Sequence, residues 1–264
     1  MKEIKVSEYK TILIDILKEF DKFCRTNNLK YSLAYGTLLG SLRHKGFIPW
    51  DDDVDVMMLR DDYELFIKTF EHPYLKLIHH SMDNGYPYPF LKLYDSRTII
   101  EEQTDSPNNF GLYVDIFPID GLPNNFLMRK IIICFLIFLR ELLNIKNMQG
   151  SQKRSFYKNF CVRLMKKLLS PVSSAYISAR MNKIAKFNRV EDSRYAGNLL
   201  WCTNKTKSFD ISIFKGLTEV KFENLTCYGL TKYDEWLNLT YGDYMQLPPE
   251  NSRVSNHSFK AYRK

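Results

Sequence analysis

The sequence has no pair of cysteines at the CxxC spacing that is typical of metal and redox motifs. Its five cysteines are scattered, at Cys24, Cys134, Cys161, Cys202 and Cys227. An odd, dispersed set gives neither a disulfide framework nor a zinc site, which favours a reducing compartment. The opening residues, MKEIKVSEYK, lack the apolar core of a signal peptide. Both features predict a cytoplasmic protein.

Long hydrophobic runs and repeats are missing as well. The stretch IIICFLIFL at 131–139 is apolar throughout, but nine residues are too few to cross a bilayer. Hydrophobic residues make up 45% of the 264 positions and aromatic residues 14%, which excludes the disordered classes. The length suits one large domain, or a domain with a subdomain.

Charge of both signs is present, but it is divided along the chain. Residues 1–125 carry 14 Lys and Arg against 20 Asp and Glu, a net charge of −6, whereas residues 126–264 carry 24 against 10, a net charge of +14. An acidic first half suits cation binding. A basic second half suits phosphate groups, anionic lipid head groups or nucleic acid.

The hydrophobic periodicity predicts a mixed order of helices and strands. Helices are expected at 4–24, 38–43, 61–70, 126–145 and 234–239. Strands are expected at 31–35, 54–59, 75–80, 90–94 and 111–117, with mixed strand and loop over 195–230. The Pro- and Gly-rich loop PIDGLPNN is expected to close the first region, 1–125. An apolar and basic helical segment, 126–190, and a C-terminal part, 191–264, that completes the same domain follow it.

An acidic cluster marks the segment WDDDVDV. Four of its five positions from 51 to 55 are aspartates, namely Asp51, Asp52, Asp53 and Asp55. Asp53 and Asp55 alternate with valines, so on a strand both carboxylates would lie on one face. Adjacent carboxylates repel and raise each other's pKa unless a cation lies between them. Asp51 and Asp52 are also typical of a solvated turn or a helix cap.

A third carboxylate, Asp115, lies in the alternating segment GLYVDIF. If its strand neighbours that of Asp53 and Asp55, the three side chains could bind Mg²⁺ or Mn²⁺, which take oxygen ligands. We therefore predict that these three aspartates form a catalytic metal site, with Asp115 the expected acceptor of the substrate's proton.

A glycine turn precedes the acidic cluster. Gly36 and Thr37 are expected to end a strand and begin a helix, where backbone N–H groups and a hydroxyl can face a phosphate. Arg43, Lys45 and Lys92 are the cations expected to neutralise that phosphate. His44 could act as an acid or base, although a loop histidine beside two cations is more often a surface residue.

Three segments of the chain resemble the LicD family, which also includes fukutin-related protein. They are YSLAYGTLLGSLRHKGFIPWDDDVDV, VDIFPIDGLP and YGDYMQLPPE, and they extend from Tyr31 to Glu250. The resemblance implies an α+β nucleotidyltransferase-like fold, a mixed sheet with flanking helices, in which residues 1–125 are the catalytic core, with a helical basic insertion and a C-terminal extension. It also implies transfer of a phospho-alcohol, such as phosphocholine or phosphoribitol, from a CDP-activated donor to a hydroxyl of a cell-surface glycan, with release of CMP.

The resemblance also implies roles for individual residues. Gly36 and Thr37 match the family's glycine-turn motif, Asp53 and Asp55 its paired metal ligands, and Asp115 its third ligand. Gly40 and Ser41 are an alternative glycine pair. The cysteine-bound zinc loop of some animal relatives has no counterpart in this sequence.

Two other functions are compatible with parts of the sequence. A nucleotidyltransferase that moves NMP from an NTP onto a hydroxyl or phosphate would use the same aspartates. A non-catalytic module that binds nucleic acid or glycan would leave those aspartates unexplained, and the basic half shows no Gly-aromatic RNA-binding signature. We therefore expect no nucleic-acid partner.

The helix expected at 126–145 allows two interpretations. The segment 126–190 has 14 Lys and Arg and a single acid, Glu141, for a net charge of +13. Burial of the helix in a core is the favoured interpretation. The alternative is peripheral contact with an anionic membrane, at the inner face of the cytoplasmic membrane, where a lipid-linked glycan acceptor would lie.

Overall fold

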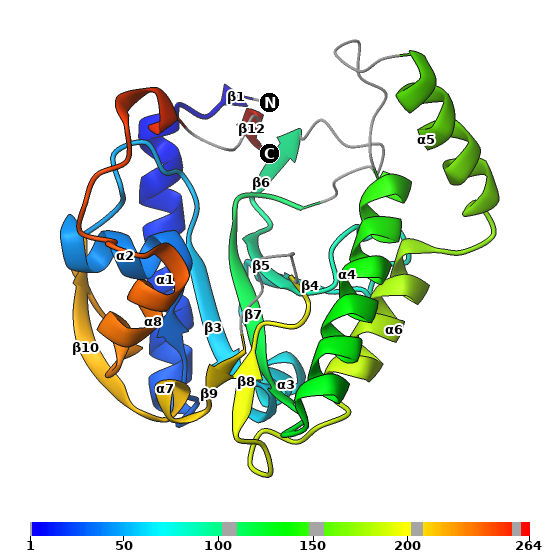
Figure 1. Cartoon of the computed structure of the whole chain (residues 1–264). Helices are drawn as coiled ribbons and strands as arrows, with labels where there is room; N and C mark the ends of the chain where they lie inside the picture. The colour runs from blue at the N-terminus through cyan, green and yellow to red at the C-terminus, as the bar shows by residue number, and fades with distance from the viewer. Residues whose placement is uncertain (1, 102–109, 148–155, 202–207, 255–259) are drawn as a thin grey trace.

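A mixed sheet forms the centre of the protein in the computed structural model, which describes residues 2–101, 110–147, 156–201, 208–254 and 260–264 (Figure 1). The strand order of this sheet is β2 (Ser32–Leu33), β3 (Asp55–Leu59), β7 (Tyr113–Leu122), β5 (Leu91–Asp95) and β4 (Leu75–Ile78). β3 and β7 are parallel, and the other neighbours are antiparallel. The predicted α+β class, with a mixed sheet and flanking helices, is confirmed.

Helices pack around this sheet because their apolar residues recur at helical spacing. α1 (Val6–Thr26) buries Leu13, Leu17, Phe20 and Cys24 along one face. α3 (Arg60–Thr69) has acids in its first turn and Lys68 in its last, as the helix dipole favours. Figure 1 shows α1 and α2 (Tyr35–Arg43) to one side of β3 and β7, and α4 (Phe126–Asn147) and α6 (Ser174–Ala185) to the other.

The C-terminal quarter of the chain adds strands to three sheets. β8 (Tyr195–Gly197) pairs with the second half of β7, and β9 (Phe209–Asp210) pairs with β8. β10 (Leu217–Phe222) and β11 (Leu225–Leu230) form a hairpin, flanked by α7 (Ser212–Lys215) and α8 (Tyr233–Tyr241). β12 (Lys260–Arg263) joins β1 (Lys2–Glu3) to β6 (Thr98–Glu101), so the two ends of the chain meet in one sheet.

Two expected boundaries are wrong. The strand expected at 31–35 ends at Leu33, and the helix expected from Leu38 already begins at Tyr35, because the Ala34 carbonyl accepts the N–H of Leu38. Gly36 and Thr37 therefore lie inside the first turn of α2. The loop expected over 118–125 is strand as far as Leu122, because β7 pairs there with both β3 and β8. Pro118 pairs with Met58 of β3 and lies between the pairing with β5, which ends at Ile116, and the pairing with β8, which begins at Asp120, so its missing N–H interrupts neither of those two pairings.

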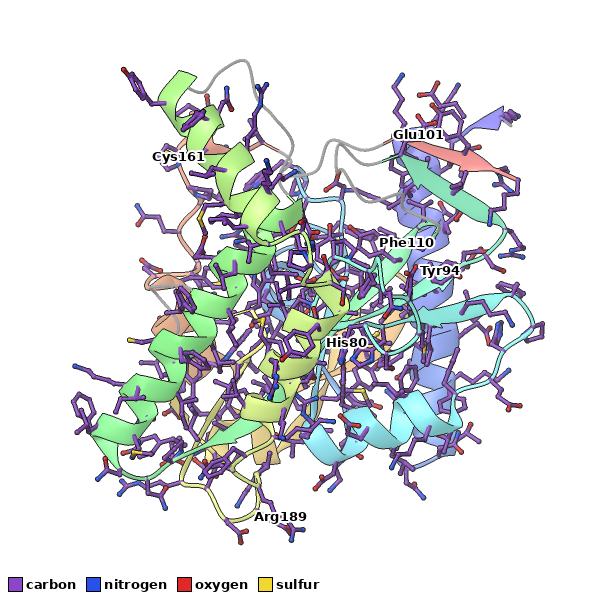
Figure 2. The ribbon with its side chains drawn as sticks, turned by 90° about the vertical axis from the view of Figure 1, so that its right-hand side faces the viewer. His80, Tyr94, Glu101, Phe110, Cys161 and Arg189 are labelled. Atoms are coloured by element: carbon purple, nitrogen blue, oxygen red, sulfur yellow. The ribbon has the colours of Figure 1, made fainter. Side chains whose placement is uncertain are left out.

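The helix expected at 126–145 extends to Asn147, and only one of its faces is buried. Arg129, Leu136 and Leu143 are buried on one face, and α4 packs against α6. The other face is exposed to solvent. Figure 2 views this side of the molecule, with α4, α5 (Phe156–Leu168) and α6 turned toward the reader. Within the described part of the chain, no helix is long and apolar enough to cross a membrane.

A buried ion pair joins the central sheet to the helices. The Arg60 guanidinium donates to both carboxylate oxygens of Asp120 at 2.7 Å, and the two side chains are 8% and 1% exposed. Arg60 also donates to Glu64 and to the amide oxygen of Asn182 on α6. Asn182 in turn donates to the Pro89 carbonyl at 2.8 Å. β7, α3 and α6 are thus fixed to one another by a shared guanidinium.

Replacing Asp120 with alanine is expected to lower the free energy of unfolding by about 3–5 kcal/mol, because the change leaves Arg60 buried without its bidentate partner. Urea unfolding followed by circular dichroism measures the loss. The matched control is Glu191→Ala, which removes the exposed partner of Arg189 and should cost less than about 1 kcal/mol. Equal, small losses in both variants would show that the buried pair does not hold these elements together.

Candidate active site

Two of the predicted acids lie side by side on the parallel strands. Asp55 is the first residue of β3, and it is paired in register with Asp115 on β7. The Asp115 N–H donates to the Val54 carbonyl at 2.9 Å, and the Ala34 N–H donates to the Asp55 carbonyl at 2.9 Å. The backbone on both sides of Asp55 is therefore hydrogen-bonded. Asp53 precedes the strand, so the expected two-residue alternation on one strand applies only to Asp55.

Lys92 lies against Asp115 from the next strand. It pairs with Asp115 in the register of β5 and β7, and its Nζ donates to Oδ1 of Asp115 at 2.6 Å. The lysine side chain is 2% exposed, and its ammonium lies 3.5 Å from the centre of the Tyr113 ring and 4.4 Å from that of Tyr88. In this structure the lysine predicted to bind phosphate contacts a carboxylate of the site.

The carboxylates form one electrostatic cluster. Burial of Asp55, together with the negative charges of Asp53, Asp115 and Asp51, raises its pKa well above the ordinary value, and the Lys92 charge opposes that rise. One lysine does not cancel the repulsion among these acids. The cluster therefore holds an excess of negative charge that favours either a proton or a metal cation.

Gly36 and Thr37 organise this cluster from the first turn of α2. The Thr37 hydroxyl accepts the Asp55 N–H at 2.8 Å and is itself buried. A Cβ on Gly36 would lie 2.5 Å from Oδ2 of Asp51, so a larger residue there would displace that carboxylate from its position against the helix. The backbone turns into the helix at Tyr35, whose φ of 43° is unusual for a bulky residue.

The alternative glycine pair has packing contacts instead. A Cβ on Gly40 would lie 2.4 Å from the Gly46 carbonyl oxygen, so the helix and the connecting segment meet there at backbone distance. The Ser41 hydroxyl is buried and donates to the Leu38 carbonyl at 2.7 Å. These contacts give Gly40 and Ser41 a role in the packing of α2.

The carboxylate oxygens of this cluster are ligands that a hard cation prefers, but the side chains are not arranged as a complete metal site. Across the described ranges, no three His, Cys, Asp or Glu side chains are grouped closely enough to hold a metal ion. The donor set is nevertheless all oxygen, and burial together with the neighbouring carboxylates raises the pKa of Asp55. Mg²⁺ and Mn²⁺ prefer such ligands, with water completing the shell.

A cavity of about 720 Å³ lies between α2 and the C-terminal part of the chain, and two carboxylates outside the cluster, Asp243 and Glu250, are among its lining residues. Its lining includes Arg43 from α2, Trp50 from the connecting segment, Tyr241 from α8, and Tyr244 and Arg253 from the segment beyond. Burial raises the pKa of Tyr241, and so do Tyr35 and the charges of Asp55, Asp51 and Asp53, which places its phenol within reach of their field. The volume is that of a typical small-ligand site.

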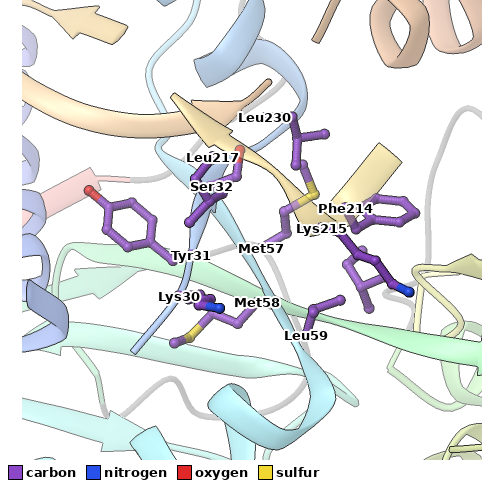
Figure 3. Close-up of a pocket in the computed structure, with 11 residues that line it drawn as sticks. Lys30, Tyr31, Ser32, Met57, Met58, Leu59, Phe214, Lys215, Leu217 and Leu230 are labelled. Atoms are coloured by element: carbon purple, nitrogen blue, oxygen red, sulfur yellow. The ribbon is translucent and has the colours of Figure 1, made fainter. Parts of the chain in front are cut away.

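A second cavity lies elsewhere on β3. It measures about 120 Å³ and is lined largely by apolar atoms, among them Met57, Met58 and Leu59 (Figure 3). Its small volume and apolar lining make it a poorer candidate for a phosphorylated substrate than the cavity that contains Arg43 and Arg253.

Of the predicted cations on this part of the chain, Arg43 lines the cavity, whereas Lys45 does not. Arg43 lines it, donates to the Tyr244 carbonyl at 2.8 Å, and lies near enough to Arg253 for that positive charge to lower its pKa, after burial. Lys45 is exposed, and its carbonyl accepts the N–H of Glu223 at the β10–β11 turn. Burial and Arg43 also lower the pKa of His44, whose Nε2 accepts from Arg43 at 3.0 Å.

Several residues of the cavity have no role in the sequence-based prediction. Tyr241 and Tyr244 lie in the segment YGDYMQLPPE, and Arg253 follows it; Trp50 precedes the aspartates. The motif itself was a signal that this segment matters. Which residues it faces depends on a contact across about 200 positions, such as that of Arg43 with Tyr244.

Comparisons with known proteins identify the family of the chain. The family model described as "LicD/FKTN/FKRP, nucleotidyltransferase domain" matches residues 28–135, which include Asp53, Asp55, Lys92 and Asp115. The lipopolysaccharide cholinephosphotransferase LicD of Haemophilus influenzae is 31% identical over 278 aligned residues, which cover 99% of each chain.

Two further relatives match over shorter stretches. An uncharacterised protein of Rickettsia typhi is 40% identical over 63 residues, which cover 24% of this chain and 20% of that protein. Mannosyltransferase regulator 4 of Saccharomyces cerevisiae is 30% identical over 118 residues, which cover 41% of this chain and 10% of that protein. The similarity to the Haemophilus protein extends over the whole chain, including the segments that form the cavity.

Replacing Asp55 with asparagine is expected to stabilise the protein in a chelating buffer at neutral pH. The folded-state pKa of Asp55 is raised above its unfolded value, so ionisation of this carboxyl opposes folding. Wild-type stability therefore falls as the pH rises from about 4, where unfolded aspartate ionises, to the folded-state pKa, and the variant escapes this loss. Each kcal/mol corresponds to about 2–4 °C in melting temperature for a chain of this size.

Thermal melting in EDTA between about pH 3.5 and pH 8 measures this difference. Asp192→Asn, at an exposed position, is the control and should follow the wild type throughout. A variant that is less stable than the wild type at every pH would mean that the ionised Asp55 carboxylate stabilises the fold.

Proposed function

Because the chain belongs to the LicD family, we propose that it is a phosphotransferase that moves a phospho-alcohol from a CDP-activated donor to a hydroxyl of a glycan and releases CMP. The name of the Haemophilus relative supports a phosphocholine-like group and a cell-surface glycan. The observation that carries the proposal is the in-register pair of Asp55 and Asp115, whose charges act together with those of Asp51 and Asp53. A cavity lined by two arginines and by Trp50, the residue that precedes Asp51, supports it.

The cavity has the chemistry to bind the donor. Arg43 and Arg253 are the cations of its lining, and guanidinium groups are suited to the oxygens of a diphosphate. The aromatic faces of Trp50, Tyr241 and Tyr244 offer surfaces on which a pyrimidine ring could stack. The charges of Asp55, Asp51 and Asp53 raise the pKa of Tyr241, after burial and Tyr35, so a donor stacked on this ring would bring its phosphates toward those carboxylates.

The aspartates would then act at the reacting phosphorus. Asp53, Asp55 and Asp115 would hold Mg²⁺ or Mn²⁺, which would neutralise charge on the diphosphate and on the CMP leaving group. Thr37 and Lys92 fix the acids in place, through the Asp55 N–H and through Oδ1 of Asp115. The hydroxyl of the glycan attacks in line, and its proton passes to a carboxylate of the cluster.

Asp53→Asn, Asp55→Asn and Asp115→Asn are each expected to lower the rate of CMP release by about 10³-fold or more, because each removes part of the charge that stabilises the phosphoryl transition state. The assay uses purified protein with Mg²⁺ and a panel of CDP-choline, CDP-ethanolamine, CDP-glycerol and CDP-ribitol, with and without glycan. Asp192→Asn is the control for an exposed carboxylate and should retain full activity.

The same assay separates the alternatives. Full activity in the three variants, with melting temperatures near that of the wild type, would exclude the aspartates from the reaction. Pyrophosphate release from an NTP, with no CMP release from any CDP-alcohol, would identify a nucleotidyltransferase. No turnover of either donor class would leave a binding module, which isothermal titration with the same glycan would detect.

Arg43→Gln and Arg253→Gln are expected to raise the KM for the donor by about 10–100-fold, because a hydrogen bond to a charged group contributes about 1.5–3 kcal/mol. Glutamine keeps an amide that can donate to the neighbouring carbonyls. Initial rates over a range of donor concentrations measure KM and kcat separately.

Lys45→Gln is the matched comparison, since Lys45 is on the same connecting segment but outside the cavity lining. A larger rise in KM for Lys45→Gln than for the two arginine variants would place the donor's phosphates on the other side of that segment. Circular dichroism of all three variants checks that the fold is kept.

A further inference from the structure

We infer that the exposed faces of α4 and α5 form a docking surface for an anionic lipid bilayer. The inference concerns a surface that contains none of the aspartates, and it does not depend on the proposed reaction. It rests on the arrangement of exposed apolar side chains, on the charge around them, and on the position of these helices at one side of the molecule (Figure 2).

α4 presents an apolar stripe to solvent. Leu127, Ile131, Phe135 and Phe138 recur at intervals of three to four residues and are 65%, 52%, 49% and 54% exposed. The stripe covers about 16 Å of helix. An isolated exposed apolar residue needs no explanation, but an aligned row on one helix marks an interaction site.

α5 repeats the pattern. Tyr157, Phe160, Leu164 and Leu168 follow the same spacing and are 79%, 58%, 48% and 64% exposed. This helix is amphipathic, and its last turn carries Lys166 and Lys167. Figure 1 shows α5 standing away from the rest of the molecule, beyond α4 and α6. The two helices thus offer large apolar side chains to whatever approaches this side.

The surrounding charge identifies the partner. The segment 126–190 contains 14 Lys and Arg and only Glu141 as an acid. Apolar side chains combined with clustered cations are the two signals that together hold a peripheral protein on an anionic bilayer, where either alone is weak. A second copy of the chain would bring the same positive surface against this one, and that repulsion disfavours a symmetric dimer through it.

The position of the surface also fits an acceptor at the membrane. A glycan attached to a lipid carrier would lie at the same bilayer surface that α4 and α5 contact. That consequence rests on the proposed function, whereas bilayer binding itself does not. Vesicle binding and transferase activity are therefore measured separately, and either can fail without the other.

The test is co-sedimentation of the wild-type protein with phosphatidylcholine vesicles that contain about 30 mol % phosphatidylglycerol. Binding is expected to the anionic vesicles and to be at least about tenfold weaker to pure phosphatidylcholine, and to fall as NaCl rises from about 50 mM to about 500 mM. A wild-type protein that stays in solution with anionic vesicles at low salt would overturn the inference.

Two pairs of variants locate the surface. Phe135→Ser with Phe138→Ser should weaken binding at least about tenfold, because two exposed aromatic anchors are lost, whereas Leu65→Ser, at a 47% exposed site on α3, should not change it. Lys167→Glu should weaken binding and reduce its salt dependence, whereas Lys221→Glu on β10 should have a smaller effect. Equal effects within each pair would contradict the assignment to α4 and α5.

A spectroscopic measurement reports contact directly. Cys134 and Cys161 are exposed on α4 and α5, whereas Cys24 and Cys227 are buried. A polarity-sensitive fluorophore on Cys134, in a Cys161→Ser and Cys202→Ser background, should shift its emission to the blue on addition of anionic vesicles. Sedimentation equilibrium provides the last arm: a dimer that the Phe135 and Phe138 changes dissociate, with no vesicle binding, would assign the surface to a second copy.

Discussion

The parallel pairing of β3 with β7 is the constraint on which the site depends, since it places Asp55 directly opposite Asp115. Two ionised carboxylates on adjacent strands repel each other, so a positive charge nearby stabilises the pair. Lys92 supplies part of it from β5, where it is buried against Asp115 and the ring of Tyr113. Burying the lysine ammonium or a carboxylate without a partner of opposite charge would destabilise the fold. The ion pair of Lys92 with Asp115 reduces that cost for both groups.

The same two strands show how differently the protein treats two buried acids. Asp120, five residues beyond Asp115 on β7, receives both arms of the Arg60 guanidinium, which also joins α3 to α6. Asp55 has no comparable match, since burial, and then the charges of Asp53, Asp115 and Asp51, raise its pKa against the opposing charge of Lys92. The fold thus gives Asp120 a full ion pair but gives Asp55 no such partner. Uncompensated charge of this kind is characteristic of sites that bind or react.

Sequence reasoning was sufficient where the signal is local. Residue spacing predicted the N-terminal helix, the strand after the acidic cluster and the acid of β7. The three segments that resemble the LicD family identified the family. Sequence reasoning was insufficient where distant parts of the chain meet. Pro118 is typical of a turn, but it lies in β7, where it pairs with Met58 of β3. The prediction that Lys92 binds phosphate stays a prediction, and the sequence did not show its contact with Asp115, which depends on the pairing of β5 with β7.

The helix α4 illustrates why an apolar pattern alone cannot decide between a core and an interface. Its sequence is apolar on every side, so periodicity offers no face to assign. Packing of α4 against α6 buries one face, which contains Leu136 and Leu143, whereas Phe135 and Phe138 on another face are exposed to solvent. Because cations dominate the surrounding segment, those side chains are kept from a like-charged copy of the chain but not from an anionic surface. The acids thus gather on the central sheet and the cations around an apolar helix face, and the two proposals give these two parts of one fold partners of opposite charge.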